Sequence, residues 1–212
     1  MLVLLLTFLG FGSTIPTPDL GLGPAYALDD LERQVDPKSG VKCPKVELTQ
    51  YRGDTVRYAT SVRVYVGFRQ RLDRFEQVVR DVALETYGRA PQRIEHLGTF
   101  NCRKMRTWDN YLSEHGLGNA IDVSGFTFAP LSRKLTKQSS LPRPLQRRFT
   151  VKIAPHWSAQ DAIGAIHQQF LHTLATRLAA RDDIFRVMLG PSHAGHKNHL
   201  HLDVSPWRIV DL

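Results

Sequence analysis

Cysteines and long apolar runs are both scarce in this chain. Beyond residue 27, no stretch of its 212 residues is long and apolar enough to cross a membrane. Its two cysteines are too few for a structural zinc site built mainly from thiolates. No internal repeats are evident. With 42% hydrophobic and 23% charged residues, the chain has the balance of a soluble globular protein, and its length suits one domain rather than two.

Acidic side chains are also in short supply. The chain has 28 lysines and arginines against 20 acidic residues, a net charge of +8. This balance indicates either an anionic partner, such as nucleic acid, an anionic membrane surface or an acidic wall polymer, or simply a solvated basic surface. Aromatic residues are not interleaved along a basic stripe, so we do not expect nucleic acid as a partner.

The first residues outline an export signal. Residues 2–11 read LVLLLTFLGF, an apolar run too short to span a bilayer comfortably, and residues 25–27 (AYA) form a small-x-small site. We predict a signal peptide over residues 1–27, with an uncleaved N-terminal anchor as the alternative, and hence a periplasmic or cell-envelope location. In an exported protein the even cysteine count favours a disulfide between Cys43 and Cys102 over two unrelated buried thiols.

Hydrophobic periodicity predicts two long helices. Residues 66–87 carry apolar side chains at helical spacing, and Gly88 and Pro91 mark the end of that helix. A second helix is expected to begin at Ser158, with Asp161 three residues later as a weak capping box. The apolar positions are Phe68, Leu72, Phe75, Val79 and Val82 in the first helix, and Ala162, Ile166, Phe170 and Leu174 in the second.

Shorter segments are predicted to be strands, which makes the fold α+β: one domain over residues 43–206, with a small antiparallel sheet flanked by the two helices. The predicted strands are residues 93–100, with 102–106 as an extension, and residues 119–126, 185–189 and 199–204. Residues 28–42 are predicted to be a linker, 130–156 a basic surface loop and 207–212 a C-terminal tail.

The chemistry is concentrated in two segments. Four of the nine histidines lie between residues 193 and 201. On a strand, His199, His201 and Asp203 share one face, and the leucines between them face the core. His115 and Asp122 lie seven residues apart, about 10.5 Å along a helix, too far for one zinc ion, and Gly116 and Gly118 break a helix in any case.

A loop that returns into a strand solves this spacing problem. With His115 on the loop and Asp122 pointing inward from a strand beside the His201 strand, three ligands converge. Two histidines and one carboxylate leave a fourth position open, as in catalytic zinc sites.

These residues resemble the signature of a zinc superfamily: an early His, an Asp seven residues later and a distal HxH. The superfamily unites D-Ala-D-Ala carboxypeptidases, lysostaphin-type endopeptidases, the penicillin-insensitive murein endopeptidase and hedgehog-type domains. The resemblance implies that His115, Asp122 and His201 bind one Zn²⁺, that His199 assists catalysis, and that His196 takes part as in the murein endopeptidase branch. Where the carboxypeptidase branch carries a catalytic Glu, this chain has Asn198.

The chain is still more similar to the bacterial extensin-like C-terminal family. The similar blocks are RIEHLGTFNCRKMR (93–106), SEHGLGNAIDVSGF (113–126) and LGPSHAGHKNHLHLDV (189–204), within a resemblance that covers roughly residues 43–206. This resemblance implies a zinc metallopeptidase-like protein that hydrolyses peptide bonds of peptidoglycan stem peptides or cross-links. A catalytically inactive, zinc-containing wall-binding module is the alternative, and a metal-dependent nuclease is a further rival.

Other residues are assigned supporting roles. Asp203 is expected to orient a ring N–H of a ligand, or else to be a surface carboxylate. Arg103 or Arg106 could hold a substrate carboxylate, and Ser113 could hydrogen-bond a ligand or the substrate. The remaining histidines are predicted to lie outside the site: His96, His156, His167, His172 and His193.

Overall fold

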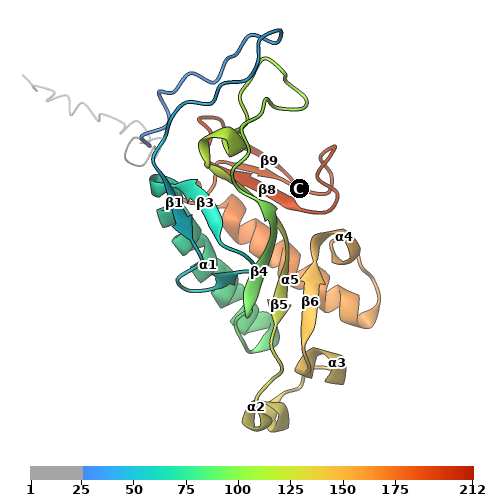
Figure 1. Cartoon of the computed structure of the whole chain (residues 1–212). Helices are drawn as coiled ribbons and strands as arrows, with labels where there is room; N and C mark the ends of the chain where they lie inside the picture. Colours follow the sequence, from blue (N-terminus) through green and yellow to red (C-terminus); the bar gives the residue numbers. More distant parts are fainter. Residues whose placement is uncertain (1–25) are drawn as a thin grey trace, which may run out of the picture.

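The computed structural model describes residues 26–212, which form a single unit of mixed helices and strands (Figure 1). Residues 1–25 of the predicted signal peptide or anchor lie outside the described residues. No helix within residues 26–212 has the length and apolar character that crossing a membrane requires.

The strands are β1 (Leu48–Tyr51), β2 (Arg57–Tyr58), β3 (Val62–Tyr65), β4 (Arg93–Gly98), β5 (Ala120–Phe128), β6 (Phe149–Lys152), β7 (Val187–Leu189), β8 (Leu200–Asp203) and β9 (Ile209–Asp211). The helices are α1 (Val66–Tyr87), α2 (Arg133–Gln138), α3 (Arg143–Gln146), α4 (Ile153–His156) and α5 (Ala162–Ala179), with a 3₁₀ turn, η1 (Glu114–Leu117).

Helix α1 has the bounds that its periodicity predicts. Its five predicted core positions are all fully buried. Gly88 ends the helix at φ 66°, a left-handed conformation that costs glycine little. Phe75 packs against Phe185 with ring centroids 5.4 Å apart, and α1 also lies against α5. The packing of its apolar face therefore holds the helix in place, and Gly88 determines where it ends.

Helix α5 begins later than predicted, at Ala162 rather than near Ser158. Its N-cap is Asp161, whose carboxylate accepts the backbone N–H groups of Ile163 and Gly164. An aspartate in this position satisfies two donors that the helix itself leaves unpaired. Ser158 instead follows directly on α4 and its C-cap.

The main sheet has seven strands. The order is β2-β4-β5-β8-β7-β9, with β6 also pairing β5, while β1 and β3 form a separate antiparallel pair. The prediction of a small antiparallel sheet was too simple, because β2 pairs β4 and β7 pairs β9 in parallel. The two parallel edge strands are only two and three residues long, too short to give an alternating pattern in the sequence.

The basic insertion is more ordered than the surface loop that was predicted. It contains α2, α3, β6 and α4, and β6 extends the sheet by pairing with the second half of β5. Leu145, Val151 and Ile153 are buried in the core. In the sequence, these apolar residues stand singly among prolines and cations, so no hydrophobic periodicity predicted their burial.

Both ends of the predicted domain are also packed. In the segment predicted to be a linker, Leu28 and Arg33 are buried. In the predicted tail, β9 pairs with β7, and Leu189 lies opposite Asp211. Neither end was recognised because its contacts are with residues far away in the sequence. Tyr26, next to the predicted cleavage site, is also buried.

Candidate metal centre

Strands β5 and β8 place two of the predicted ligands side by side. The strands pair antiparallel, and Asp122 lies directly opposite His201 in their register. The prediction that these two strands are neighbours is thus confirmed. Leu200 and Leu202 are buried, so the core face of β8 is the one expected from its alternation. The opposite face brings His201 toward Asp122.

The third residue comes from a tight turn rather than from the sheet. His115 lies in η1, and Gly118 closes the turn at φ 63° before β5 begins. Gly116 packs so closely on the disulfide that a Cβ there would lie 2.7 Å from the Cys43 sulfur. The predicted disulfide between Cys43 and Cys102 is confirmed, and it lies against the turn that carries His115.

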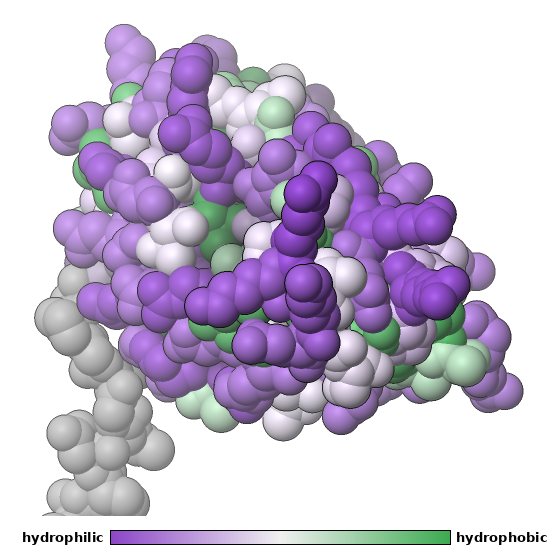
Figure 2. Space-filling model, turned by 90° about the horizontal axis from the view of Figure 1, so that it is seen from below, coloured by the Kyte–Doolittle hydropathy of each residue, from purple (hydrophilic) through white to green (hydrophobic). Residues whose placement is uncertain are grey.

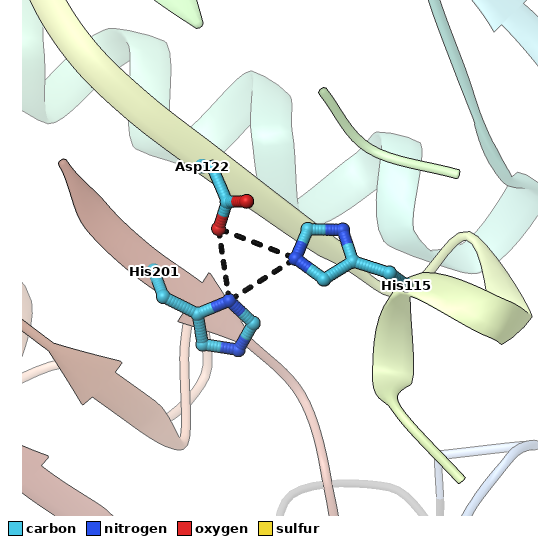
Figure 3. A group of neighbouring side chains, drawn as sticks. All are labelled: His115, Asp122 and His201. Atoms are coloured by element: carbon cyan, nitrogen blue, oxygen red, sulfur yellow. Dashed lines mark hydrogen bonds and ion pairs between the residues drawn. The ribbon is translucent and has the colours of Figure 1, made fainter. Parts of the chain in front are cut away.

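One side-chain atom from each of His115, Asp122 and His201 forms a corner of a small triangle (Figure 3). His115 Nε2 lies 3.2 Å from Asp122 Oδ1 and 3.2 Å from His201 Nδ1, and the last two atoms are 3.0 Å apart. Among the described residues this is the one group of three or more His, Cys, Asp or Glu side chains whose candidate ligand atoms lie within 4.8 Å of one another. Tetrahedral zinc with bonds near 2.0–2.2 Å places its ligands about 3.3 Å apart.

The outer nitrogen of each imidazole has a hydrogen-bond acceptor. His115 Nδ1 lies 2.9 Å from the Thr99 carbonyl oxygen, and His201 Nε2 lies 2.8 Å from Asp203 Oδ2. Asp203 Oδ1 in turn accepts the backbone N–H of Ser205. A neutral ring at either position can therefore donate its N–H outward and turn a lone pair inward, the usual arrangement around metal ligands.

The donor set fits a cation. When both rings are neutral, two nitrogen lone pairs and one carboxylate oxygen face each other, and their repulsion is relieved only by a cation or by an added proton. The residues and their spacing suit Zn²⁺, which takes nitrogen and oxygen ligands in this geometry.

The electrostatics of the group point the same way. Burial opposes ionisation of Asp122, but hydrogen bonds from His115 and His201 hold the pKa of its carboxyl well below the ordinary range. Burial also opposes a charge on His201, yet its contacts with Asp122 and Asp203 raise the pKa of its ring to about 9. Without a metal, His201 therefore holds a proton at neutral pH, so the centre is a buried position that favours positive charge, and a bound cation would take the place of that proton.

His199 lies beside this group, immediately before β8. Its Nε2 is 3.5 Å from Asp122 Oδ1, and its Nδ1 is 2.9 Å from the side-chain oxygen of Asn198. Burial lowers the pKa of His199, opposed by Asp122. The Asn198 oxygen accepts the Nδ1 proton, so the Nε2 lone pair faces the site.

His193, His196 and His199 form a row of neighbouring imidazole rings, which we call the histidine ladder, with His196 in the middle. Successive turns link the backbones, with N–H groups of His193, His196 and His199 bonded to residues three positions earlier. The rings of His193 and His196 are 5.1 Å apart, and those of His196 and His199 are 5.0 Å apart. Burial and the neighbouring His201 and His199 lower the pKa of His196 to about 4, so it is neutral at pH 7.

The far end of the ladder is held by the C-terminal strand. His193 Nδ1 lies 2.7 Å from one oxygen of Asp211, and the Ser192 hydroxyl donates to the other at 2.6 Å. Sequence reasoning left His193 outside the site and assigned no role to Asp211. Their contact joins β9 to the loop that carries His196.

The arginines predicted to bind substrate flank the centre. Burial lowers the pKa of Arg103, and the negative charge of Asp122 opposes this shift. The positive charge of Arg106 also lowers the pKa of His199, but less than burial does. The backbone N–H of Ser113 donates to the Arg103 carbonyl. Among the described residues, the Ser113 hydroxyl makes no hydrogen bond to a ligand.

A buried polar network beneath the turn was not predicted. Arg33 Nε donates to Glu114 Oε1 at 2.8 Å, and Asn119 Nδ2 donates to Glu114 Oε2 at 2.5 Å. The Tyr26 hydroxyl donates to Asn119 Oδ1 at 2.6 Å. Glu114 directly precedes His115, and Asn119 lies between His115 and Asp122 in the sequence, which was the signal available. The network fixes η1 against the N-terminal segment.

The other histidines lie apart from the centre, as predicted. His167 contacts the Tyr87 hydroxyl, His172 contacts the Trp157 carbonyl, and His96 contacts Thr60. The Nδ1 of His156 accepts the backbone N–H of Lys152. Each of these rings thus has a local partner.

Comparison with known proteins identifies the family. Residues 27–210 match the family described as extensin-like protein C-terminus. Neither curated proteins nor solved structures gave a match. The matched range includes every residue of the candidate centre and begins within the N-terminal segment that packs beneath it. The chain therefore belongs to the extensin-like protein C-terminus family.

Proposed function

We propose that this protein is a zinc metallopeptidase that hydrolyses peptide bonds in the stem peptides or cross-links of peptidoglycan. The proposal includes a relationship to the D-Ala-D-Ala carboxypeptidase, lysostaphin and hedgehog-type superfamily. The observation that carries it is the inward-facing triangle of His115 Nε2, Asp122 Oδ1 and His201 Nδ1, with edges of 3.0–3.2 Å. Three protein ligands with an open fourth position are typical of catalytic zinc.

Zinc bound at this triangle would polarise a peptide carbonyl and lower the pKa of water at the open position. His199 supplies the base: its Nε2 takes the proton of the attacking water while the water oxygen bonds to the carbonyl carbon. When the C–N bond breaks, the same Nε2 returns the proton to the leaving amine. Asn198 keeps Nδ1 protonated, so that Nε2 is the atom available for both transfers.

Two further side chains support this chemistry. Neutral His196, with its ring 5.0 Å from that of His199, limits water access and keeps a second positive charge away from the base. Arg103, whose charge interacts with that of Asp122, would hold a substrate carboxylate, and stem peptides of peptidoglycan carry such groups. The predicted export signal and the disulfide support action in the periplasm or cell envelope.

A zinc-containing wall-binding module without activity is the second candidate. Asn198 favours it, because the carboxypeptidase branch of the superfamily carries a Glu base there. Under this alternative the triangle still binds zinc, but His199 does not take the water proton and no peptide bond is cleaved.

Two measurements test the proposal. Metal analysis should find about one zinc per chain, lost in His115→Ala and in Asp122→Ala but kept in His172→Ala, a control on the exposed side of α5. Purified muropeptides should be cleaved by the zinc-loaded protein and not by His199→Ala, which should keep its zinc. Zinc and wall binding without cleavage by the wild type would establish the module instead, and a chain that binds no zinc would refute both.

A further inference from the structure

The positive charge of the chain is concentrated in one projection. Residues 130–152, which we call the basic tip, contain seven lysines and arginines and no acidic residue. The rest of the chain has 21 basic and 20 acidic side chains, so it is nearly neutral. The basic tip therefore accounts for almost the whole net charge of +8. Its cations are Arg133, Lys134, Lys137, Arg143, Arg147, Arg148 and Lys152.

These cations are exposed and lack acidic partners. All seven residues are exposed, and none forms an ion pair with any residue in 26–212. Only the Arg148 guanidinium makes a side-chain hydrogen bond within the described chain, to neutral Gln92 at 2.9 Å. Glu95, which contacts Thr127 at the root of the tip, is already paired with Arg93 at 2.6 Å. The charge is thus free to act on a partner.

The basic tip also exposes an apolar side chain among its cations. Helix α2 has no buried residue, and its Leu135 is 42% exposed between Lys134 and Lys137. Seen from the end of the molecule that carries α2, hydrophilic residues cover most of the surface and apolar ones show between them (Figure 2). A cluster of four to eight lysines and arginines is attracted to anionic headgroups, and an adjacent apolar side chain can enter the interface.

We propose that the basic tip docks on the surface of an anionic phospholipid bilayer. A wall polymer or a nucleic acid would use the charge but not Leu135, and the tip has no exposed aromatic ring on which bases could stack. This proposal rests on the charge distribution of the tip and is independent of the peptidase proposal.

Such docking would orient the molecule. The basic tip begins just after Phe128, at one end of β5, and only its last strand, β6, returns along β5 as far as Gly125. Asp122 lies near the other end of β5, about 20 Å from Phe128 at the rise of a strand. In Figure 1, α2 and α3 accordingly lie at the opposite end of the molecule from η1 and β8. With the tip on a bilayer, the candidate metal centre faces away from the lipid.

The test places a reporter on α2 of the full chain. Both natural cysteines are in the disulfide, so a cysteine introduced by Gln138→Cys can be labelled alone with an environment-sensitive fluorophore. A second protein carries the same label through Lys42→Cys, on an exposed residue of the N-terminal segment. Vesicles of phosphatidylglycerol and phosphatidylcholine, or of phosphatidylcholine alone, are then titrated against each protein.

We expect a blue shift at position 138 with anionic vesicles only, and none at position 42. Each cation near an anionic surface strengthens binding about fivefold, so Arg133→Gln, Lys134→Gln and Lys137→Gln together should weaken it roughly 100-fold. The matched triple variant Lys38→Gln, Lys42→Gln and Lys45→Gln, tested with the label at position 138, should bind like the wild type. Leu135→Ser should reduce the binding that survives in high salt.

Three results would overturn the proposal. One is an equal shift at both labels, which would show that the contact is not confined to the tip. Another is equal weakening by both triple variants, which would show a dependence on net charge alone. The last is a shift at position 138 with peptidoglycan sacculi or DNA but not with anionic vesicles, which would assign the tip to a polymer.

Discussion

Replacing Asp203 by asparagine should damage the metal centre without removing a ligand. Asp203 accepts two hydrogen bonds, from His201 Nε2 at 2.8 Å and from the backbone N–H of Ser205 at 2.9 Å. Asparagine has a single acceptor oxygen, so one of these donors must face the amide NH₂ group. If the NH₂ group faces His201, the ring must protonate on Nδ1, the atom that points at the metal position.

The expected loss can be estimated from the role of such contacts. Removing the partner of a ligating histidine typically weakens metal binding 10–100-fold, or about 1.4–2.7 kcal/mol. We expect this weakening in Asp203→Asn and none in Asp182→Asn, which changes an exposed carboxylate elsewhere. Competition for zinc against a chromophoric chelator measures it, with circular dichroism to establish that the metal-free variant is folded. A folded Asp203→Asn protein with wild-type zinc affinity would refute the proposed orienting role.

Three further predictions concern stability. Replacing Cys43 and Cys102 together by serine should lower the free energy of unfolding by about 4 kcal/mol, because the bridge closes a loop of 59 residues. Denaturant titration measures this loss, and an unchanged unfolding midpoint would contradict the prediction. Arg33→Ala leaves the buried Glu114 carboxylate without its cation and should cost about 3–5 kcal/mol, whereas exposed Arg52→Ala should cost little in the same titration. Burial lowers the pKa of His167 from 6.5 to about 4, so its neutral form stabilises the fold above pH 6.5, and up to about 3 kcal/mol is lost as the pH falls from 6.5 through 4. His167→Phe should flatten this part of the stability curve, and an unaltered pH dependence would show that other groups cause it.

The parts of the fold that the sequence predicts are those with a local repeating pattern. Helix α1 has an apolar face every three to four residues and a glycine stop, so both of its bounds follow from local rules. The alternation around His201 likewise indicates which side chains of β8 face the core. Because the register of β5 and β8 sets Asp122 opposite His201, the two ligands meet once each strand is recognised.

The remaining features depend on contacts between distant residues. Arg33 and Glu114 are 81 positions apart, and neither residue type predicts a buried partner. Thr99 orients His115 through a main-chain carbonyl, an atom that every residue has, so no side-chain signal marks it. Strand β6 is four residues long and finds its partner only when β5 is already in place.

The position of the disulfide has a practical consequence for preparing the protein. The Cys43 sulfur lies against Gly116, next to His115, and supports the turn from outside. A chain expressed in a reducing cytosol would lack this support. Such material would bind zinc poorly for reasons unrelated to the ligands themselves, so measured occupancies are meaningful only for protein whose thiols have been shown to be oxidised.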